Sequence, residues 1–237
     1  MFAFAIDTLH EPQIIAYIEN VKNLESIKTN LGYRELRLIN VDNIQSLKSA
    51  IEKATKKYEN NGFIYMLDEN KSILTGTFVS NIKVIKSSKT NIHLSGNVWH
   101  HPKGYHKSWE LKINNQMSEK NIWKDLRKDE LQGWLVYALH TMKITSAKEN
   151  IKIQIDGNDF HNLDEFFCTI GEEVNGIGGY FGRNLYALHD CMRGDFGIKS
   201  ISELTWQNHE RSKKLFKARF NKILKIFEEY KTDVILK

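Results

Sequence analysis

Hydrophobic and polar residues alternate along the chain with two different periods, which predict helices and strands. Apolar residues three and four positions apart predict helices near 12–21, 42–54, 119–142, 162–175, 185–192 and 211–231. Apolar residues at every second position predict strands near 2–6, 35–41, 151–155, 198–206 and 233–236. Between them, an antiparallel meander is predicted by short apolar runs at 63–67, 73–79, 82–85, 92–99 and 109–113.

The order of these elements predicts two domains of different fold class. Residues 1–145 are expected to form an α+β domain with antiparallel strands. Residues 150–237 follow the order strand, helix, helix, strand, helix, strand. This order predicts an α/β domain with a small three-stranded parallel sheet packed with helices. The polar, non-periodic residues 146–150 mark the expected boundary.

Residues 178–194 combine a glycine turn, two aromatic residues and a short helix that ends near Gly194. At about 100° per residue, one side of this helix is apolar and predicts a core contact. That side carries Leu185, Leu188, Cys191 and Met192. The opposite side, which carries Arg183, Tyr186, His189, Asp190 and Arg193, is charged and aromatic. Because these groups sit on a rigid element next to Tyr180, we expect this side to bind another molecule.

The positive charge of the chain is concentrated in its first part. The whole chain has 34 basic and 29 acidic residues, which gives a net charge of +5. Residues 151–237 hold 13 of each kind, which leaves 21 basic and 16 acidic residues for residues 1–150. A basic first part favours nucleic-acid binding, although an ordinary lysine-rich surface explains the same scatter of charges.

The cysteines and the N-terminus indicate the compartment. Cys168 and Cys191 form no CxxC motif, and both lie in apolar helical patterns where a free cysteine behaves as a small buried hydrophobe. The N-terminus lacks the basic region of a signal peptide, and no apolar run reaches the ~18 residues of a membrane span. We therefore expect a soluble cytoplasmic protein without a membrane partner.

Motifs of common enzyme classes are missing from the sequence: the glycine-rich nucleotide-binding loops, GxSxG and HExxH. His100, His101 and His106 could serve a metal or acid–base chemistry, which leaves an enzymatic first domain as an alternative. We expect them instead on an exposed hairpin loop, because no carboxylate or cysteine lies nearby at a ligand spacing. We predict no catalytic residue, cofactor or metal. The expected core anchors are Trp99, Trp109, Trp123 and Trp134.

Residues 180–191, with the sequence YFGRNLYALHDC, resemble the barstar family, the intracellular inhibitors of barnase-type ribonucleases. The family pattern here is two aromatic residues, Gly, a variable residue, Asn-Leu, a variable residue, Ala-Leu, Trp or a similar residue, Asp and Cys. The resemblance extends over residues 151–237 and does not cover residues 1–145. It continues through the segments IDG (155–157) and LDEF (163–166), Trp206 and the last helix.

The resemblance implies a binding protein that plugs a nuclease active site with this helix and the loop before it. It implies contact roles for Tyr180, Asp190 and Glu229. The chain departs from the family at Tyr186, where the family has an acidic residue, and at His189, where it has tryptophan. We therefore expect a cognate nuclease toxin other than barnase as the partner, and an immunity function. The predicted contact residues are Tyr180, Arg183, Asn184, Tyr186, His189, Asp190, Arg193 and Glu229.

Besides an enzymatic first domain, two alternatives remain open at this point. In the first, the basic N-terminal domain binds RNA or DNA as a regulatory protein, and the barstar-like domain is a protein-docking module. In the second, the barstar-like fold is kept but its inhibitory surface is lost, because Arg183 and Arg193 add positive charge to a face that is acidic in the family.

Overall fold

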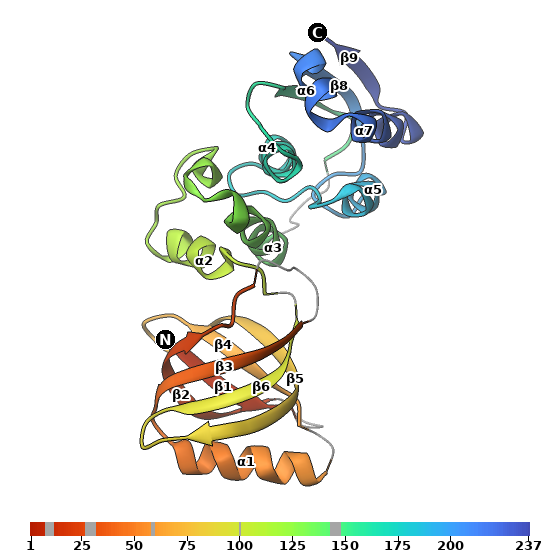
Figure 1. Cartoon of the computed structure of the whole chain (residues 1–237). Coiled ribbons are helices and arrows are strands. Elements are labelled where there is room, and N and C mark those ends of the chain that lie inside the picture. Colours follow the sequence, from red (N-terminus) through yellow and green to blue (C-terminus); the bar gives the residue numbers. More distant parts are fainter. Residues whose placement is uncertain (8–11, 27–31, 58–59, 100, 143–147) are drawn as a thin grey trace. The chain divides into compact units, whose positions relative to one another are not determined.

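The computed structural model describes residues 1–7, 12–26, 32–57, 60–99, 101–142 and 148–237. These residues form two compact units, Met1–Lys103 and Gly104–Lys237. We call them the barrel unit and the second unit, and describe each by itself (Figure 1). Among the described residues, no helix is long and apolar enough to cross a membrane.

The barrel unit is a closed barrel of six strands in the order β1-β2-β3-β6-β5-β4. Each neighbouring pair is antiparallel, including the pairs β1–β4 and β3–β6 that join the two halves of the barrel. Closure leaves no unpaired strand edge. The strands are β1 (Phe2–Ile6), β2 (Gln13–Lys22), β3 (Gly32–Val41), β4 (Gly62–Leu67), β5 (Ile73–Ser87) and β6 (Ile92–Val98).

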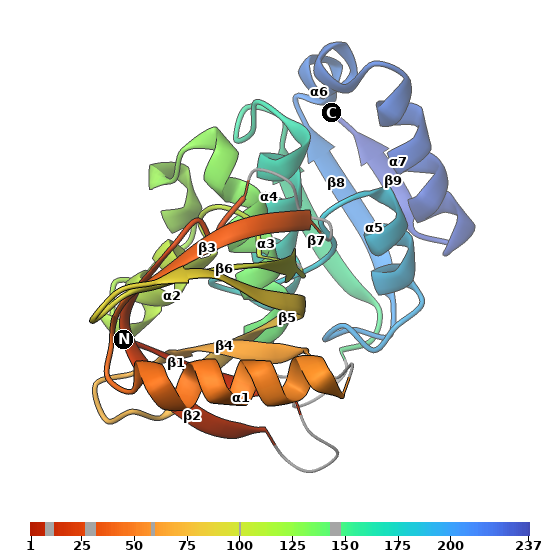
Figure 2. The same cartoon turned by 60° about the horizontal axis from the view of Figure 1, so that its bottom comes forward.

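Helix α1 (Ile44–Lys56) lies across one end of the barrel (Figures 1 and 2). Asn43 caps it, because its side chain accepts a hydrogen bond from the backbone N–H of Ser46. The apolar stripe of α1, which includes Leu47 and Ile51, joins the buried residues of the strands in one core. The helix predicted at 42–54 is therefore confirmed.

Two predictions in the first 113 residues are wrong. Residues 12–21, predicted as a helix, form strand β2, because the segment pairs with both β1 and β3 and its β-branched residues suit that environment. Residues 109–113, predicted as a strand, belong to helix α2 (Tyr105–Ile113). The predicted strands 73–79 and 82–85 are one strand, β5, whose pairing with β6 has a register shift between Ser80 and Lys83.

The second unit contains a three-stranded parallel sheet in the order β7-β8-β9, as predicted. The strands are β7 (Ile151–Asp156), β8 (Ile201–Gln207) and β9 (Asp233–Leu236). Four helices connect them: α4 (Leu163–Asn175), α5 (Leu185–Met192), α6 (His209–Phe216) and α7 (Ala218–Glu229). The predicted long helix 211–231 is divided into α6 and α7 at Lys217, whose φ of 53° is incompatible with a continuous helix.

The residues just before this sheet also belong to the second unit. The predicted helix 119–142 is instead two short 3₁₀ turns, η1 (Ile122–Asp125) and η2 (Lys128–Glu130), followed by α3 (Leu131–Thr141). Trp123 and Trp134 are buried in the same core as the sheet and α4. The compact unit therefore begins at Gly104, about 40 residues before the polar segment on which the predicted domain boundary rests.

Aromatic packing forms the centre of this core. The Trp206 indole on β8 is fully buried and stacks on Phe166 of α4 at 5.5 Å between ring centroids. Phe160 and Phe216 stack on each other at 5.6 Å, and both contact Phe166. These rings fix α4 and α6 against the sheet, and so they position the helices around α5.

Candidate protein-binding surface

Helix α5 has one buried side and one exposed side. The Asn184 side chain caps its start by accepting a hydrogen bond from Ala187 N–H at 2.9 Å. Leu188, Cys191 and Met192 are buried against the core, on the side predicted to be apolar. Asn184 therefore has a structural task, in addition to its predicted place among the contact residues.

Tyr186 is the most prominent group on the exposed side. Its exposed fraction is 87%, which is very high for an aromatic residue on a regular helix. On the same side, Asp190 and Arg193 form an ion pair with 3.5 Å between Oδ1 and Nη1, and both side chains are more than half exposed. A large ring beside one charged pair is the composition of a binding hot spot.

His189 extends this surface towards helix α7. Its Nε2 lies 3.4 Å from Oε1 of Glu229, at the end of α7. The ring of Tyr230 meets the imidazole edge-on at 5.3 Å, and its hydroxyl lies 3.5 Å from the imidazole nitrogens. The structure therefore brings together His189 and Glu229, two predicted residues 40 positions apart. It adds Tyr230, which the sequence pattern missed because it follows the last turn of α7.

The loop before α5 lies against α4 with no room for side chains between them. A Cβ atom added to Gly179 would lie 2.6 Å from the carbonyl oxygen of Gly171, so this contact requires glycine. Gly182 has φ of 98°, and a Cβ there would lie 2.9 Å from the backbone nitrogen of Leu188. The glycines of the predicted turn thus allow the backbone to pass close to α4 and α5.

A buried carboxylate, Glu172 on α4, ties three segments together. One oxygen, Oε1, accepts a hydrogen bond from Gly178 N–H at 3.1 Å. The other, Oε2, accepts bonds from Asn121 N–H at 2.7 Å and from the Trp123 indole N–H at 3.1 Å. Sequence analysis missed Glu172. The one signal that could have found it is its place as a charged residue among the apolar, buried positions of an amphipathic helix. Glu172 holds the loop before α5 in one conformation.

Two amides complete this support. Asn175 Nδ2 donates to the carbonyl oxygens of Tyr180 and Phe196, at 2.7 and 3.0 Å. Gln132 of α3 donates to Asp164 at 2.7 Å and to the carbonyl oxygen of Arg183 at 3.3 Å. The backbone that leads into α5 is therefore fixed from both α3 and α4.

Tyr180 lies in the core rather than on the exposed surface. Its exposed fraction is 3%, its ring packs near Phe196 at 6.1 Å, and burial raises the pKa of its phenol. Sequence analysis predicted that this ring lies beside the exposed side of α5. The prediction was wrong because two adjacent aromatic residues after a glycine turn give no signal of which ring is buried. Its neighbour Phe181 is buried as well.

Both cysteines are free and buried, as expected. Burial raises the pKa of Cys191 to about 12, and also raises the pKa of Cys168. Thiols that stay protonated at neutral pH are poor nucleophiles. The cysteine on α5 therefore serves packing, and the chemistry of this helix lies on its other side.

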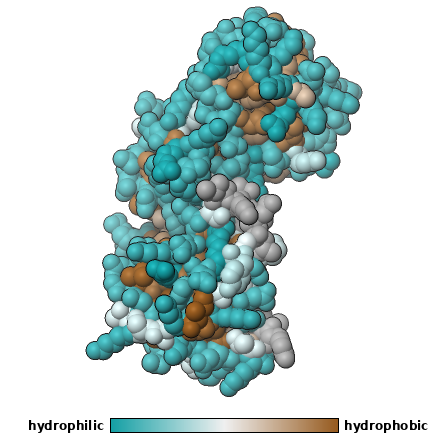
Figure 3. All heavy atoms as spheres, in the orientation of Figure 1, coloured by the Kyte–Doolittle hydropathy of each residue, from teal (hydrophilic) through white to brown (hydrophobic). Residues whose placement is uncertain are grey.

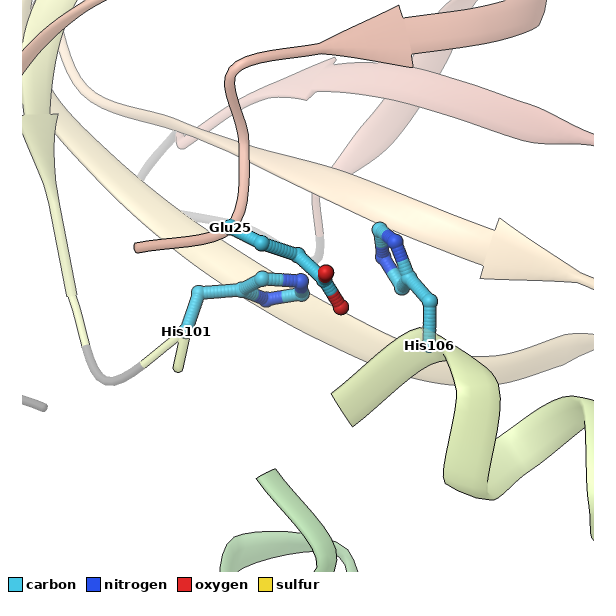
Figure 4. A group of neighbouring side chains, drawn as sticks. All are labelled: Glu25, His101 and His106. Atoms are coloured by element: carbon cyan, nitrogen blue, oxygen red, sulfur yellow. The ribbon is translucent and has the colours of Figure 1, made fainter. Parts of the chain in front are cut away.

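The histidine-rich segment differs from the predicted hairpin loop. His100 lies outside the described residues. His101 belongs to the barrel unit, where it is buried and its Nδ1 lies 2.5 Å from the Thr77 hydroxyl. His106 belongs to the second unit, at the start of α2; Figure 4 draws both histidines with Glu25 of the barrel unit. The segment leads into a helix, because Gly104 with φ of 89° turns the chain directly into α2.

The four tryptophans predicted as core anchors divide into two groups. Trp123 and Trp134 are buried in the second unit. Trp109 is partly exposed on α2, and the exposed fraction of Trp99 is 40%, so Trp99 is not a core residue. It lies on the outer surface of the barrel, where its ring meets the edge of Phe78 at 6.1 Å.

Comparison with known proteins finds a family similar to the C-terminal part of the second unit. No curated protein matches the chain in sequence. Residues 151–234 match the family model described as Barstar (barnase inhibitor). This match covers the parallel sheet, α4 and the α5–α7 surface, and the order of these elements agrees with the predicted barstar-like fold. Residues 151–234, in the C-terminal part of this chain, are therefore similar to the barstar family in sequence and in the order of their helices and strands.

Proposed function

We propose that this protein inhibits a partner ribonuclease toxin, as an immunity protein, by covering the nuclease active site with the exposed side of α5. The observation that carries the proposal is the combination of an inhibitor-family match with a strongly exposed Tyr186 on a rigidly supported helix. Pre-organised surfaces bind well because little conformational entropy is lost on association. The mechanism needs no catalysis and no cofactor.

The chemistry of the surface suggests how it meets a nuclease. Cationic side chains in a ribonuclease cleft hold the phosphates of RNA, and a carboxylate can take the place of a phosphate. Asp190 is the exposed carboxylate at the centre of the surface, with Tyr186 one helical turn before it. In the free protein Asp190 contacts Arg193, so binding exchanges this ion pair for contacts with the partner.

The charge balance suggests a barnase-type partner other than barnase itself, with a less cationic or differently shaped active site. Asp190 contacts Arg193, and Glu229 contacts His189, so each acid on the surface has a basic neighbour. Residues 151–237 hold equal numbers of basic and acidic residues. Long-range steering towards a strongly basic enzyme is therefore weak, and recognition relies on shape and on the rings of Tyr186 and Tyr230.

We expect Tyr186→Ala and Asp190→Ala each to weaken the complex by at least ~2 kcal/mol, as hot-spot truncations do. The experiment titrates the protein against a panel of barnase-type ribonucleases and measures RNA cleavage and affinity for each responsive enzyme. Tyr33→Ala removes an exposed ring of the barrel unit, and Asp159→Ala removes an exposed acid paired with Lys124. These controls should retain wild-type affinity. Wild-type affinity in both α5 variants would reject the proposed surface.

A further inference from the structure

Four neighbouring strands of the barrel place a row of basic side chains directly opposite one another. Lys22 of β2 pairs with Arg37 of β3, Arg37 pairs with His93 of β6, and His93 pairs with Lys86 of β5. The strands β2, β3, β6 and β5 lie side by side in the barrel (Figure 1). These residues lie between positions 22 and 93 of the chain, so the row exists only in the folded barrel.

The row lies on the outer face of the barrel. Directly opposed residues of antiparallel strands point to the same side of a sheet. Leu36 and Leu38, on either side of Arg37, are fully buried in the barrel core, so Arg37 points outward. Lys22, Arg37 and Lys86 are all exposed. With strands ~4.8 Å apart, the row spans roughly 14 Å.

Like charges in directly opposed positions destabilise a sheet unless counter-charges lie close by. Among the described residues, none of the ion pairs involves Lys22, Arg37 or Lys86. Glu35 is the acid in contact with the row, and its Oε2 lies 3.3 Å from Nε2 of His93. The row therefore has an excess of positive charge, which an external anion would relieve.

A hollow of about 360 Å³ lies along this row. Arg37, His93 and Lys86 line it together with Asn91 and the hydroxyl-bearing Ser87 and Ser88. This volume lies in the lower range of small-molecule sites, about 300–1,000 Å³. Ile39 and Ile92 also line the hollow, beside its basic and polar groups. Figure 3 shows hydrophilic residues over most of the visible surface of the molecule.

The floor of the hollow is held in place by the β5–β6 turn. Asn91 Oδ1 accepts a hydrogen bond from Asn40 N–H at 3.0 Å, and Thr90 carbonyl oxygen accepts one from Val41 N–H at 2.8 Å. Asn91 N–H also donates to the Ser88 hydroxyl at 3.1 Å. The turn is thus fixed to the end of β3, which keeps the lining groups at constant positions.

His93 supplies two buried ring nitrogens that make no hydrogen bond among the described residues. Its side chain is 12% exposed, and neither ring nitrogen makes a hydrogen bond, although Nε2 lies 3.3 Å from Oε2 of Glu35. Buried polar atoms without partners are costly, and they often mark a place where a ligand or water completes the bonding. His93 lines the hollow, next to Arg37 and Lys86.

We propose that this hollow binds phosphate groups, either of a single nucleotide or of successive nucleotides in a single strand. The planar guanidinium of Arg37 suits a bidentate contact with phosphate oxygens, and Lys86 and Lys22 provide point charges on either side. The Ser87 hydroxyl and the side-chain amide nitrogen of Asn91 offer polar groups for a sugar or base. The site lies in the barrel unit, so it is a function separate from the inhibitor surface on α5.

The test uses the full chain and two fluorescent probes, a ten-nucleotide single-stranded RNA and a labelled ADP, at low salt. We expect the pair Arg37→Gln/Lys86→Gln to weaken probe binding at least about tenfold. For the RNA probe, the slope of log affinity against log salt should fall by roughly 1.4, because each lost contact with a single strand removes about 0.7. Circular dichroism should show that the double variant keeps its fold.

The control pair Lys53→Gln/Lys56→Gln removes the same charge from exposed positions of α1 and should change affinity by less than about twofold. Equal affinity for ADP and RNA would identify a single-phosphate site, and tighter, more salt-dependent RNA binding would identify a strand-binding site. Absence of binding to both probes, or equal weakening by the control pair, would overturn the proposal. Neither result would affect the inhibitor proposal.

Discussion

Replacing Glu172 by alanine should lower the free energy of unfolding of the second unit by about 3 kcal/mol. The carboxylate is 2% exposed and accepts hydrogen bonds from Asn121, Trp123 and Gly178. Without it, these three N–H groups lose their partner, and each unsatisfied buried donor costs about 1–3 kcal/mol. Because Asn121 is exposed, water can partly solvate its N–H group, so the total cost is smaller than three full penalties.

The measurement is urea unfolding followed by tryptophan fluorescence, because four of the five tryptophans lie in the second unit. Glu173→Ala provides the control: its neighbouring carboxylate is partly exposed and pairs with Lys120 at 2.9 Å. That variant should lose less than about 1 kcal/mol, as surface ion pairs do. Equal stability of Glu172→Ala and Glu173→Ala would show that the three hydrogen bonds contribute nothing.

The same substitution should also weaken partner binding. Glu172 holds Gly178 in the loop that leads to α5, so its loss frees a segment that must be ordered again on association. Hydrogen exchange of residues 176–184 should become faster in Glu172→Ala and stay unchanged in Glu173→Ala. This readout separates the effect on the loop from a general loss of stability.

The second large effect is expected for Trp206→Ala, which should cost about 3–5 kcal/mol, the range for deletion of a large buried ring. The Trp206 indole is fully buried at the centre of the sheet. It contacts Phe166 and Phe220 at 5.5 and 5.1 Å between ring centroids, and its N–H donates to the Ser212 hydroxyl at 3.0 Å. Alanine leaves a cavity and an unpaired hydroxyl at the junction of β8, α4 and α6.

Trp206→Phe provides the comparison, since it keeps an aromatic ring but removes the hydrogen bond and part of the volume. It should cost about 1–2 kcal/mol, between wild type and alanine. Circular dichroism at 222 nm during urea unfolding gives both values without relying on the deleted fluorophore. A loss below 1 kcal/mol in the alanine variant would mean that the aromatic core can close around the gap.

The sequence predicted the sheet topology of residues 151–237 better than that of the barrel unit, for physical reasons. Helices α4 and α5 begin at asparagine caps, Asn162 and Asn184, and carry clear apolar stripes, so local pattern was sufficient. The parallel sheet followed from the alternation of strands and helices. The closed barrel depends on the pairs β1–β4 and β3–β6, which join distant segments and leave no local signal.

The errors occurred where tertiary contacts override local pattern. Residues 13–22 contain isoleucines at helical spacing, but pairing on both edges makes the segment a strand. Lys217 interrupts a continuous apolar stripe with a positive φ that its side chain does not signal. Tyr180 is buried beside Gly179, whose backbone passes close to that of Gly171 on α4, and this tertiary contact has no signal in the local pattern.

Sequence analysis predicted which residues of α5 form the candidate surface, but it predicted only part of their arrangement in space. Helical periodicity placed Tyr186, His189 and Asp190 on one side, and the structure has them there. The contact of His189 with Glu229 and Tyr230 needed the packing of α5 beside α7. The support from Glu172 could not be predicted, because its donors are 51 positions earlier and 6 positions later in the chain.

The central claim is that the exposed side of α5 blocks a ribonuclease, and stoichiometric titration of RNA cleavage tests it most directly. Increasing amounts of the protein are added to each barnase-type ribonuclease of the panel, and the initial rate of cleavage is measured. The account predicts that cleavage by at least one enzyme falls linearly to zero at one equivalent, and is restored in the double variant Tyr186→Ala/Asp190→Ala. Undiminished cleavage by every enzyme, or equal inhibition by the double variant, would contradict it.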